Sequence, residues 1–162
     1  MAEIIYARKD LIPAFHKTLD EVASERIFIE MIEAPPVEKV TEFQVKAIDG
    51  NFPVFYAVEG TEVVGWADVF PSSNPRQAHR GFLGMGLRKS HRGLGLGTKL
   101  LEAVIAHAKK IGLAKIELSV YSTNRAGIRL YEKLGFEQCG YTKDYRRVDG
   151  ASFDAISMEL FL

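Results

Sequence analysis

The stretch that decides the fold reads LRKSHRGLGLGTK and runs from Leu87 to Lys99. Its three glycines, Gly93, Gly95 and Gly97, occupy alternate positions, three basic residues precede them, and an amphipathic run follows. A glycine loses more backbone freedom on folding than any other residue. We therefore expect this loop either where the chain turns as other residues cannot, or where a ligand approaches the backbone closely.

The segments before this loop predict two helices and four strands. Apolar and β-branched runs predict the strands, and Gly60-Thr61 between two of them is typical of a hairpin. We expect Asp10 to be the N-cap of the first helix, with Pro13 in its first turn. The predicted strands are Ile4–Ala7, Val54–Glu59, Glu62–Phe70 and His79–Leu87, and the predicted helices are Leu11–Ala23 and the run VEKVTEFQVKAI.

The segments after the loop alternate between helix and strand. A helical period starts at Gly95, keeps Leu100, Leu101 and Val104 on one face, and ends at Gly112. The further predicted elements are a strand over Lys115–Tyr121, a helix over Asn124–Leu134, a strand from Phe136 and a last strand ending at Leu162. This order, β-α-α-β-β-β-α-β-α-β-β, predicts an α/β (α+β) fold whose largely antiparallel sheet contains one parallel βαβ crossover.

Composition narrows the class of protein. The 162 residues fit one domain, 1–162, and the 21 basic and 21 acidic residues leave no formal net charge. We therefore expect no nucleic acid and no membrane as a partner. One cysteine, Cys139, and the absence of an apolar leader favour a cytoplasmic protein. No His, Cys, Asp or Glu residues have metal-ligand spacing, so we expect no metal.

The glycine loop lies between a predicted strand and a helix N-terminus, where free amides and the helix dipole favour an anion such as a diphosphate. The Walker pattern fails because Gly97-Thr98-Lys99 has the wrong order, and the dinucleotide pattern G-x-G-x-x-G fails as well. A tight turn that binds nothing is the alternative. The pattern that fits is R-x-x-G-x-G, over Arg92–Gly97.

At this motif the chain resembles the GCN5-related N-acetyltransferase (GNAT) superfamily, which binds acetyl-CoA there. The segment NRAGIRLYEKLGF, Asn124–Phe136, resembles the family's N-x-x-A-x-x-L-Y-x-x-x-G-F, with Gly127 in place of the alanine. The ending Tyr145–Phe161 resembles the closing hairpin of the amino-acid and protein N-terminal branch. The resemblance implies a mostly antiparallel sheet of six to seven strands, flanked by four helices and splayed between strands 4 and 5.

The resemblance also implies roles for individual residues. Tyr131 would protonate the leaving thiolate, and its ordinary pKa near 10 keeps the phenol protonated at pH 7. The alternative role of Tyr131 is that of a tyrosine packed in the core. The alternative role of Asn124 is that of a helix N-cap. The residues implied to bind acetyl-CoA are Met85, Gly86 and Leu87 along the pantetheine arm, Arg92, Gly93, Leu94, Gly95, Leu96, Gly97 and Thr98 through their amides, then Asn124, Gly127 and Lys133, the last of which is otherwise a solvated helix lysine.

The acceptor side is less clearly marked. A base for the amine could be His79, Glu117 or Asp68, each also plausible as an ordinary strand or surface residue. The segment SERIFIEMIEAPP and the region from Tyr141 to Phe153 are expected to shape the pocket. The candidates for recognising the acceptor in that segment are Glu25, Arg26, Phe28 and Glu33. The alternative is an ordinary amphipathic segment with Phe28 and Ile32 in the core.

Three other residues are not expected to take part in the chemistry. We expect His91 and His107 to be exposed and Cys139 to be a small buried or edge residue.

These observations favour an acetyl-CoA-dependent N-acetyltransferase that works by direct transfer in a ternary complex. The expected acceptor is a primary amine of a small molecule, an amino acid or an amino-acid-like antimetabolite. The alternatives are a protein N-terminus or ribosomal protein as acceptor, a non-catalytic acyl-CoA-binding module, and a nucleotide-binding protein. Family resemblance also implies a homodimer.

Overall fold

The computed structural model describes residues 1 to 162, and its element order is the predicted one. The four helices are α1 (Ile12–Ser24), α2 (Val37–Asp49), α3 (Leu96–Lys110) and α4 (Arg125–Lys133). The seven strands are β1 (Glu3–Tyr6), β2 (Val54–Glu59), β3 (Glu62–Pro71), β4 (Arg80–Leu87), β5 (Lys115–Tyr121), β6 (Glu137–Val148) and β7 (Ala151–Phe161).

One sheet contains all seven strands, in the order β1-β2-β3-β4-β5-β7-β6. Every neighbouring pair is antiparallel except β4 and β5, which α3 connects as a parallel crossover. The α/β sheet with one parallel pair and a splay between β4 and β5 confirms the predicted fold class.

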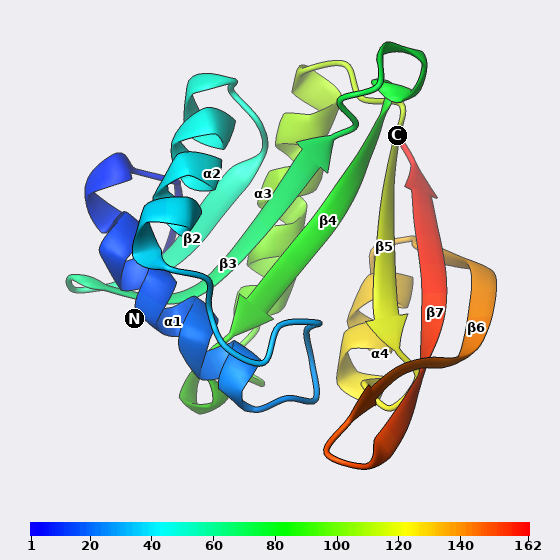
Figure 1. Cartoon of the computed structure of the whole chain (residues 1–162). Coiled ribbons are helices and arrows are strands. Elements are labelled where there is room, and N and C mark those ends of the chain that lie inside the picture. The colour runs from blue at the N-terminus through cyan, green and yellow to red at the C-terminus, as the bar shows by residue number, and fades with distance from the viewer.

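Two helices cover each face of the sheet (Figure 1). On one face α1 and α2 pack over β2 and β3, and Phe15, Tyr56 and Trp66 belong to a buried cluster there. On the other face α3 and α4 cover a larger cluster that includes Leu100 and Ile116. No helix lies in front of β5 to β7 in the view of Figure 1, so the half of the sheet beyond β4 is open on that face.

Four local predictions were wrong, and in three of them a contact with a distant or neighbouring side chain is the reason. Asp10 lies in a short 3-10 helix, where it accepts hydrogen bonds from Arg8, and Leu11 takes the N-cap position of α1. Ile32 is exposed, because the segment between α1 and α2 leaves the core. The two histidines expected at the surface are both half-buried: His91 contacts Glu59, and His107 stacks on Tyr6.

No helix of the structure has the length and apolar character needed to cross a membrane. The loop between α4 and β6 and the loop after α3 both turn at glycines with positive φ, Gly135 and Gly112, as the sequence predicts for helix C-termini. Cys139 is exposed on the edge strand β6. Neither these two glycine turns nor Cys139 belongs to the site described below.

Candidate active site: a wedge between two strands

The central feature is a wedge that opens between β4 and β5. Their ladder contains only three residue pairs, from Arg80 with Lys115 to Phe82 with Glu117. Beyond that point β5 continues to pair with β7 up to Tyr121, while the rest of β4 loses its neighbour on that side. The two strands therefore diverge toward their C-terminal ends (Figure 1).

The edge of β4 that faces the wedge offers free backbone groups. The amide of Arg88 donates to Val64 O on β3, at 2.9 Å. The backbone N–H and C=O groups of successive residues point to opposite edges of a strand. Those of Gly86 therefore also point to β3, whereas those of Met85 and Leu87 point into the wedge. Gly86 was expected to pair with a ligand through its backbone, and the register instead directs that backbone to β3.

One of these free groups already has a partner. The carbonyl of Leu87 accepts hydrogen bonds from Nε and Nη2 of Arg92, at 3.1 and 2.9 Å. Both backbone groups of Met85 and the amide of Leu87 remain available to a ligand. An extended arm that carries amides could occupy this edge as an added strand does.

The glycine loop is shaped by two glycines rather than three. Gly93 and Gly95 have φ values of +75° and +81°, and no atom lies within 4 Å of a Cβ built on either. Gly97 is different, because its Cβ would lie 2.9 Å from Leu130 Cδ2 of α4. The first two let the loop turn and leave its surface open, whereas Gly97 lets α3 and α4 pack closely.

The N-terminus of α3 is free of internal partners. Gly95 is its N-cap, no side chain caps it, and its first turn contains no acidic residue. The first amides of the helix therefore point outward with the positive end of the helix dipole. This arrangement suits a diphosphate, which Gly93 and Gly95 would allow to approach the backbone.

The basic residues beside the loop are mostly held by acids. The Arg92 guanidinium binds Glu25 through two hydrogen bonds, at 2.9 and 2.5 Å, and lies 4.4 Å from the centre of the Phe28 ring. Arg88 pairs with Glu21 and Glu62. An anion at this loop would therefore meet main-chain amides rather than free guanidinium groups.

Tyr131 lies on α4 and is buried, with its ring packed at an angle against Phe136. Burial raises the pKa of Tyr131 above its ordinary value, and no hydrogen bond contributes to that shift. The phenol is thus a neutral donor at any physiological pH. Asn124 is the N-cap of α4, and its Oδ1 accepts the amide of Gly127 at 2.9 Å.

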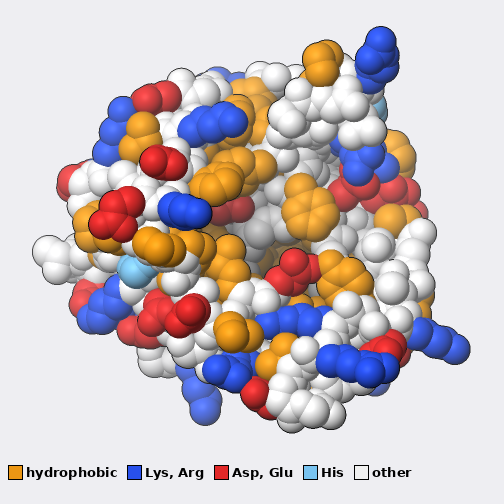
Figure 2. Space-filling model, viewed as in Figure 1, with side chains coloured by type: hydrophobic (Ala, Val, Ile, Leu, Met, Phe, Trp, Pro, Cys, Tyr) orange, Lys and Arg blue, Asp and Glu red, His pale blue; other side chains and the backbone are white.

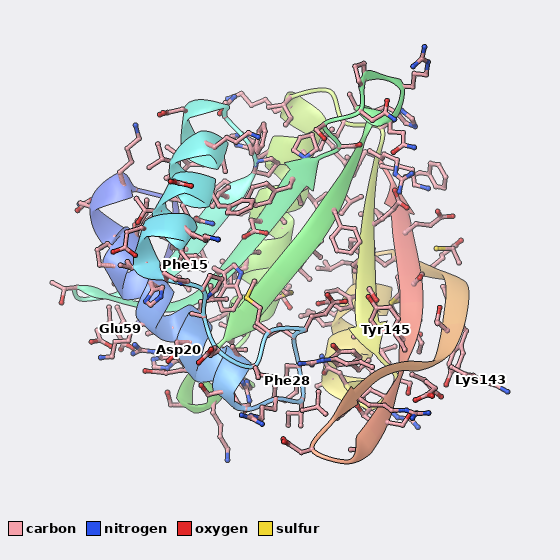
Figure 3. The ribbon with its side chains drawn as sticks, viewed as in Figure 1. Phe15, Asp20, Phe28, Glu59, Lys143 and Tyr145 are labelled. Atoms are coloured by element: carbon pink, nitrogen blue, oxygen red, sulfur yellow. The ribbon has the colours of Figure 1, made fainter.

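The opposite face of the wedge is crossed by residues 25–36, which connect α1 to α2 and which we call the strap. The strap is joined to the hairpin of β6 and β7 at three points: Arg26 with Asp149 at 2.8 Å, Ile29 O with Arg146 Nη1 at 2.8 Å, and Glu30 with Tyr145. Figure 3 labels Phe28 on the strap and Tyr145 on the hairpin, both on the face seen in Figure 1. The bond between Glu25 and Arg92 holds the other side of the strap to the glycine loop.

Three side chains were candidates for a base, and the structure places them differently. Glu117 lies where β4 and β5 still pair, and it forms an ion pair with Arg80. His79 is exposed and precedes β4, so it lies about 20 Å from Met85 at the spacing of an extended strand. Asp68 is half-buried on β3, and burial raises its pKa to about 7.

The surface over the wedge is hollowed. Figure 2 shows a depression near the middle of this face, between the helices and β5 to β7, with hydrophobic and a few acidic side chains around it. The structure thus brings the glycine loop, the free edge of β4 and Asp68 to one region, and it leaves His79 outside. No group of three or more His, Cys, Asp or Glu side chains is placed to hold a metal ion.

Sequence reasoning expected the region from Tyr141 to Phe153 at the acceptor side without singling out Tyr145 or Arg146, and it missed Tyr121. Arg146 donates to Ile29 O and to the hydroxyl of Tyr121, at 2.8 and 3.1 Å. The residues that these bonds join lie 25 and 117 positions apart. No local pattern connects such positions, so only the fold could identify them.

Comparisons with known proteins agree with this geometry. The model of the acetyltransferase (GNAT) family matches residues 16–136. An L-methionine sulfoximine/L-methionine sulfone acetyltransferase from Pseudomonas aeruginosa is 32% identical over 123 residues, which are 74% of this chain and 70% of that protein. The [ribosomal protein bS18]-alanine N-acetyltransferase of Escherichia coli is 41% identical over 66 residues, which are 41% of this chain and 45% of that enzyme.

A solved structure supports the same fold. The phosphinothricin acetyltransferase of Sinorhizobium meliloti, solved in complex with acetyl-CoA, superposes with a TM-score of 0.89 and 20% identity, over 99% of this chain and 88% of that one. The family match covers well over half of the chain, and it falls on the wedge, the glycine loop and α4. The chain therefore belongs to the GNAT family of acetyl-CoA-dependent N-acetyltransferases.

Proposed function

We propose that this acetyltransferase acts on the primary amine of a small molecule, an amino acid or an amino-acid-like antimetabolite. The observation that carries the proposal is the strap, which crosses the open end of the wedge and is joined to the hairpin at three points. A polypeptide acceptor needs an open channel for the residues that follow its N-terminus. A bridged opening favours an acceptor that fits entirely beneath it.

The cofactor side of the reaction follows from the free backbone groups. Both backbone groups of Met85 and the amide of Leu87 would bind the pantetheine arm, and the amides at the start of α3 would bind the diphosphate. The side-chain amide of Asn124 retains its two N–H donors, because only its oxygen is engaged by Gly127. It can therefore donate to the arm. Lys133 is exposed and can reach outer phosphates.

The wedge would hold amine and thioester together, which converts a bimolecular reaction into one within a complex. The amine nitrogen attacks the thioester carbonyl, the C–N bond forms, and the C–S bond breaks. Tyr131 donates its phenolic proton to the departing sulfur, and a proton from the nitrogen restores the phenol. The amide of Met85 or Leu87 would donate to the oxygen on which negative charge develops.

Arg146 supports an acceptor that carries a carboxylate. Three of the four half-buried arginines, Arg80, Arg88 and Arg92, pair with carboxylates of this chain. Arg146 binds only a backbone carbonyl and the neutral hydroxyl of Tyr121. A half-buried guanidinium without a counter-charge beside the acceptor opening favours an anionic group in the ligand. An α-amino acid would supply it.

An acceptor panel tests the proposal. Release of CoA is measured with the amino acids, methionine sulfone, methionine sulfoximine, phosphinothricin, polyamines and short peptides that begin with alanine. Each amino acid is matched with the amine that lacks its carboxylate. We expect turnover with one or more free amino acids or their analogues and little with peptides. Preferred turnover of the alanine peptides would instead favour a protein N-terminus as acceptor, in line with the E. coli relative.

Two neighbouring arginines provide a matched test of the carboxylate. Arg146→Met should raise KM for acceptors with a carboxylate at least tenfold and leave KM unchanged for the matched amines without one. Arg147→Met is the control, because Arg147 is exposed and pairs with Asp144 on its own hairpin. An equal effect of Arg146→Met on both sets of acceptors would show that Arg146 only supports the strap.

A further inference from the structure

We propose that Asp68 is the base that removes a proton from the acceptor amine. The proposal rests on the proposed function and adds to it a catalytic residue on β3, outside both family motifs. Asp68 was one of three bases that the sequence left open. In the structure Asp68 differs from His79 and Glu117 in its position along the strands and in its bonding partners.

The position of Asp68 follows from the alternation of side chains along β3. Ala67 and Val69 belong to the cluster beneath α3, so Trp66 and Asp68 face α1 and α2. That is the face crossed by the strap, where the acceptor would enter. Asp68 thus lies on the acceptor side of the sheet, while Met85 and Leu87 direct their side chains to the other cluster.

The carboxylate also reaches across to β4. Asp68 pairs in register with Gly84, and a Cβ built on Gly84 would lie 3.0 Å from Asp68 Oδ1. A side chain at position 84 would crowd the carboxylate, and the glycine leaves that space to it. Because Gly84 immediately precedes Met85, the carboxylate lies one residue along β4 from the first backbone groups that face the wedge. A thioester held on Met85 and an amine approaching it would meet there.

Asp68 differs from the half-buried glutamates in having no cation, and from the other half-buried aspartates in its partners: Asp20 accepts a hydrogen bond from Ala34 N, and Asp154 accepts bonds from Tyr141 and from the amide of Asp144. The glutamates Glu25, Glu117 and Glu159 are bound by Arg92, Arg80 and Lys115. Asp68 forms no ion pair, and the amide of Gly84 is the one group that favours its charged form. A carboxylate held by a cation is a weak base, whereas one that burial alone affects holds a proton near neutral pH.

The groups packed around Asp68 do not supply a competing charge. On β2 the Tyr56 phenol donates to Gln44 Oε1 of α2, and Asp68 contributes to raising the pKa of that phenol. From α1 the buried Phe15 ring stacks on Tyr56 and is uncharged. On β4 the nearest residues on the same face are Phe82, Gly84 and Gly86, and none of them carries a charge. No charged side chain contributes to the pKa shift of Asp68.

The proton balance uses both Asp68 and Tyr131. An amine reaches the site as an ammonium ion, and Asp68 accepts one proton to give the free amine. That amine forms the C–N bond as the C–S bond breaks, and its second proton passes through Tyr131 to the sulfur. Asp68 then releases its proton to solvent. The products are the amide, which keeps one N–H, and the CoA thiol.

The test compares Asp68→Asn with the wild type, using an acceptor identified by the panel. Asn keeps the size of the side chain and removes its basicity. We expect kcat/KM to fall about 100-fold or more, in the range of general base catalysis, with acetyl-CoA affinity unchanged by calorimetry. The acidic limb of the wild-type pH profile of kcat/KM, with its midpoint near the pKa of about 7, should disappear.

Two further variants keep the outcomes separate. Glu117→Gln should retain the acidic limb, because Arg80 already holds that carboxylate. Asp49→Asn, at a surface pair with Lys9, controls for a general effect of removing a carboxylate. An unchanged limb in Asp68→Asn, or its loss in Glu117→Gln, would overturn the assignment. A wild type that acetylates no amine would overturn the proposed function itself, together with its base.

Discussion

The glycine loop and the strap lie at the same end of the wedge and are built by opposite means. The loop, residues 88–95, offers main-chain amides, and its shape depends on two glycines with positive φ. The strap, residues 25–36, is held by side chains that meet partners on the hairpin and on the loop itself. In the proposed function, the cofactor side is thus made of backbone, and the acceptor side of side chains.

This difference teaches how one fold can keep its donor and change its acceptor. A backbone site depends on a few residues that permit a turn, so substitutions elsewhere leave it intact. A side-chain site changes whenever one partner of a long-range pair changes. The predictions below test this contrast, from the largest expected effect to the smallest.

The largest effect is expected at Gly95. Gly95→Glu should weaken acetyl-CoA binding about 100-fold or more, because a carboxylate would occupy the space of the diphosphate on a residue that needs positive φ. Calorimetric titration measures the affinity. Gly112→Glu is the matched control, since Gly112 has a φ of +86° and equally open space but follows the opposite, C-terminal end of α3. Equal affinity in both variants would exclude this loop as the diphosphate site.

Tyr131→Phe should lower kcat about 100-fold and leave acetyl-CoA affinity unchanged, because only the proton donor is removed. Burial raises the pKa of Tyr131, so its deprotonation should add no basic limb to the pH profile below pH 10. Tyr6→Phe, at a half-buried tyrosine on the edge strand β1 that donates to Phe52 O, is the control. Wild-type turnover in Tyr131→Phe would remove the acid role and leave Tyr131 as a core residue.

Asp68→Asn should stabilise the fold in a pH-dependent way. The folded pKa of about 7 lies above the ordinary value of 3.8, so the folded state disfavours the ionised form. Ionising Asp68 therefore lowers the free energy of unfolding. This loss is absent below pH 4, grows as the pH rises to 7 and is complete above it. We expect Asn to raise the free energy of unfolding by ~2 kcal/mol at pH 8 and by little at pH 4. Denaturant unfolding at both values measures it, and an equal gain at pH 4 would contradict the raised pKa.

The pair between Glu25 and Arg92 should couple the two regions. Glu25→Gln and Arg92→Gln remove a half-buried bidentate contact that joins the strap to the loop. A double-mutant cycle on the free energy of unfolding should give a coupling of about 1 kcal/mol. Both single variants should also raise KM for the acceptor. Strictly additive effects would show that the strap and the loop act independently.

The smallest effect is expected for Arg26→Ala. Arg26 and Asp149 are both exposed, and exposed ion pairs contribute little to stability. We expect a change in the free energy of unfolding below about 0.5 kcal/mol, together with a modest rise in acceptor KM. A larger loss of stability would indicate that the strap depends on this pair more than on the bond between Arg146 and Ile29 O.

The contrast between the two regions also explains what could be predicted from the sequence. The element order was predicted because strand and helix periods, and glycines such as Gly112 and Gly135, are local signals. The splay of the sheet was implied by the family resemblance. The glycine loop, like the element order, was recognisable from local signals. Gly97 belongs to the same motif, but its packing against Leu130 involves another helix and is not readable from the motif.

The acceptor side could not be predicted to the same degree. Arg146 and Ile29 meet across 117 positions, and neither lies in a recognisable pattern. Asp68 looked like any polar strand residue until its register with Gly84 was known. His79 seemed a plausible base because it is close to β4 in sequence, but it lies at the far end of that strand from the loop. Whether a residue can act as the base depends on its distance along the strand from the wedge, which the sequence pattern alone does not give.

The most direct test of the central claim is a crystal structure with acetyl-CoA bound. We expect the diphosphate on the amides between Gly93 and Thr98, and the pantetheine arm hydrogen-bonded to Met85 inside the wedge, with its thioester beside Tyr131. A bound cofactor that leaves the edge of β4 free, with its diphosphate held by side chains away from the glycine loop, would contradict the account.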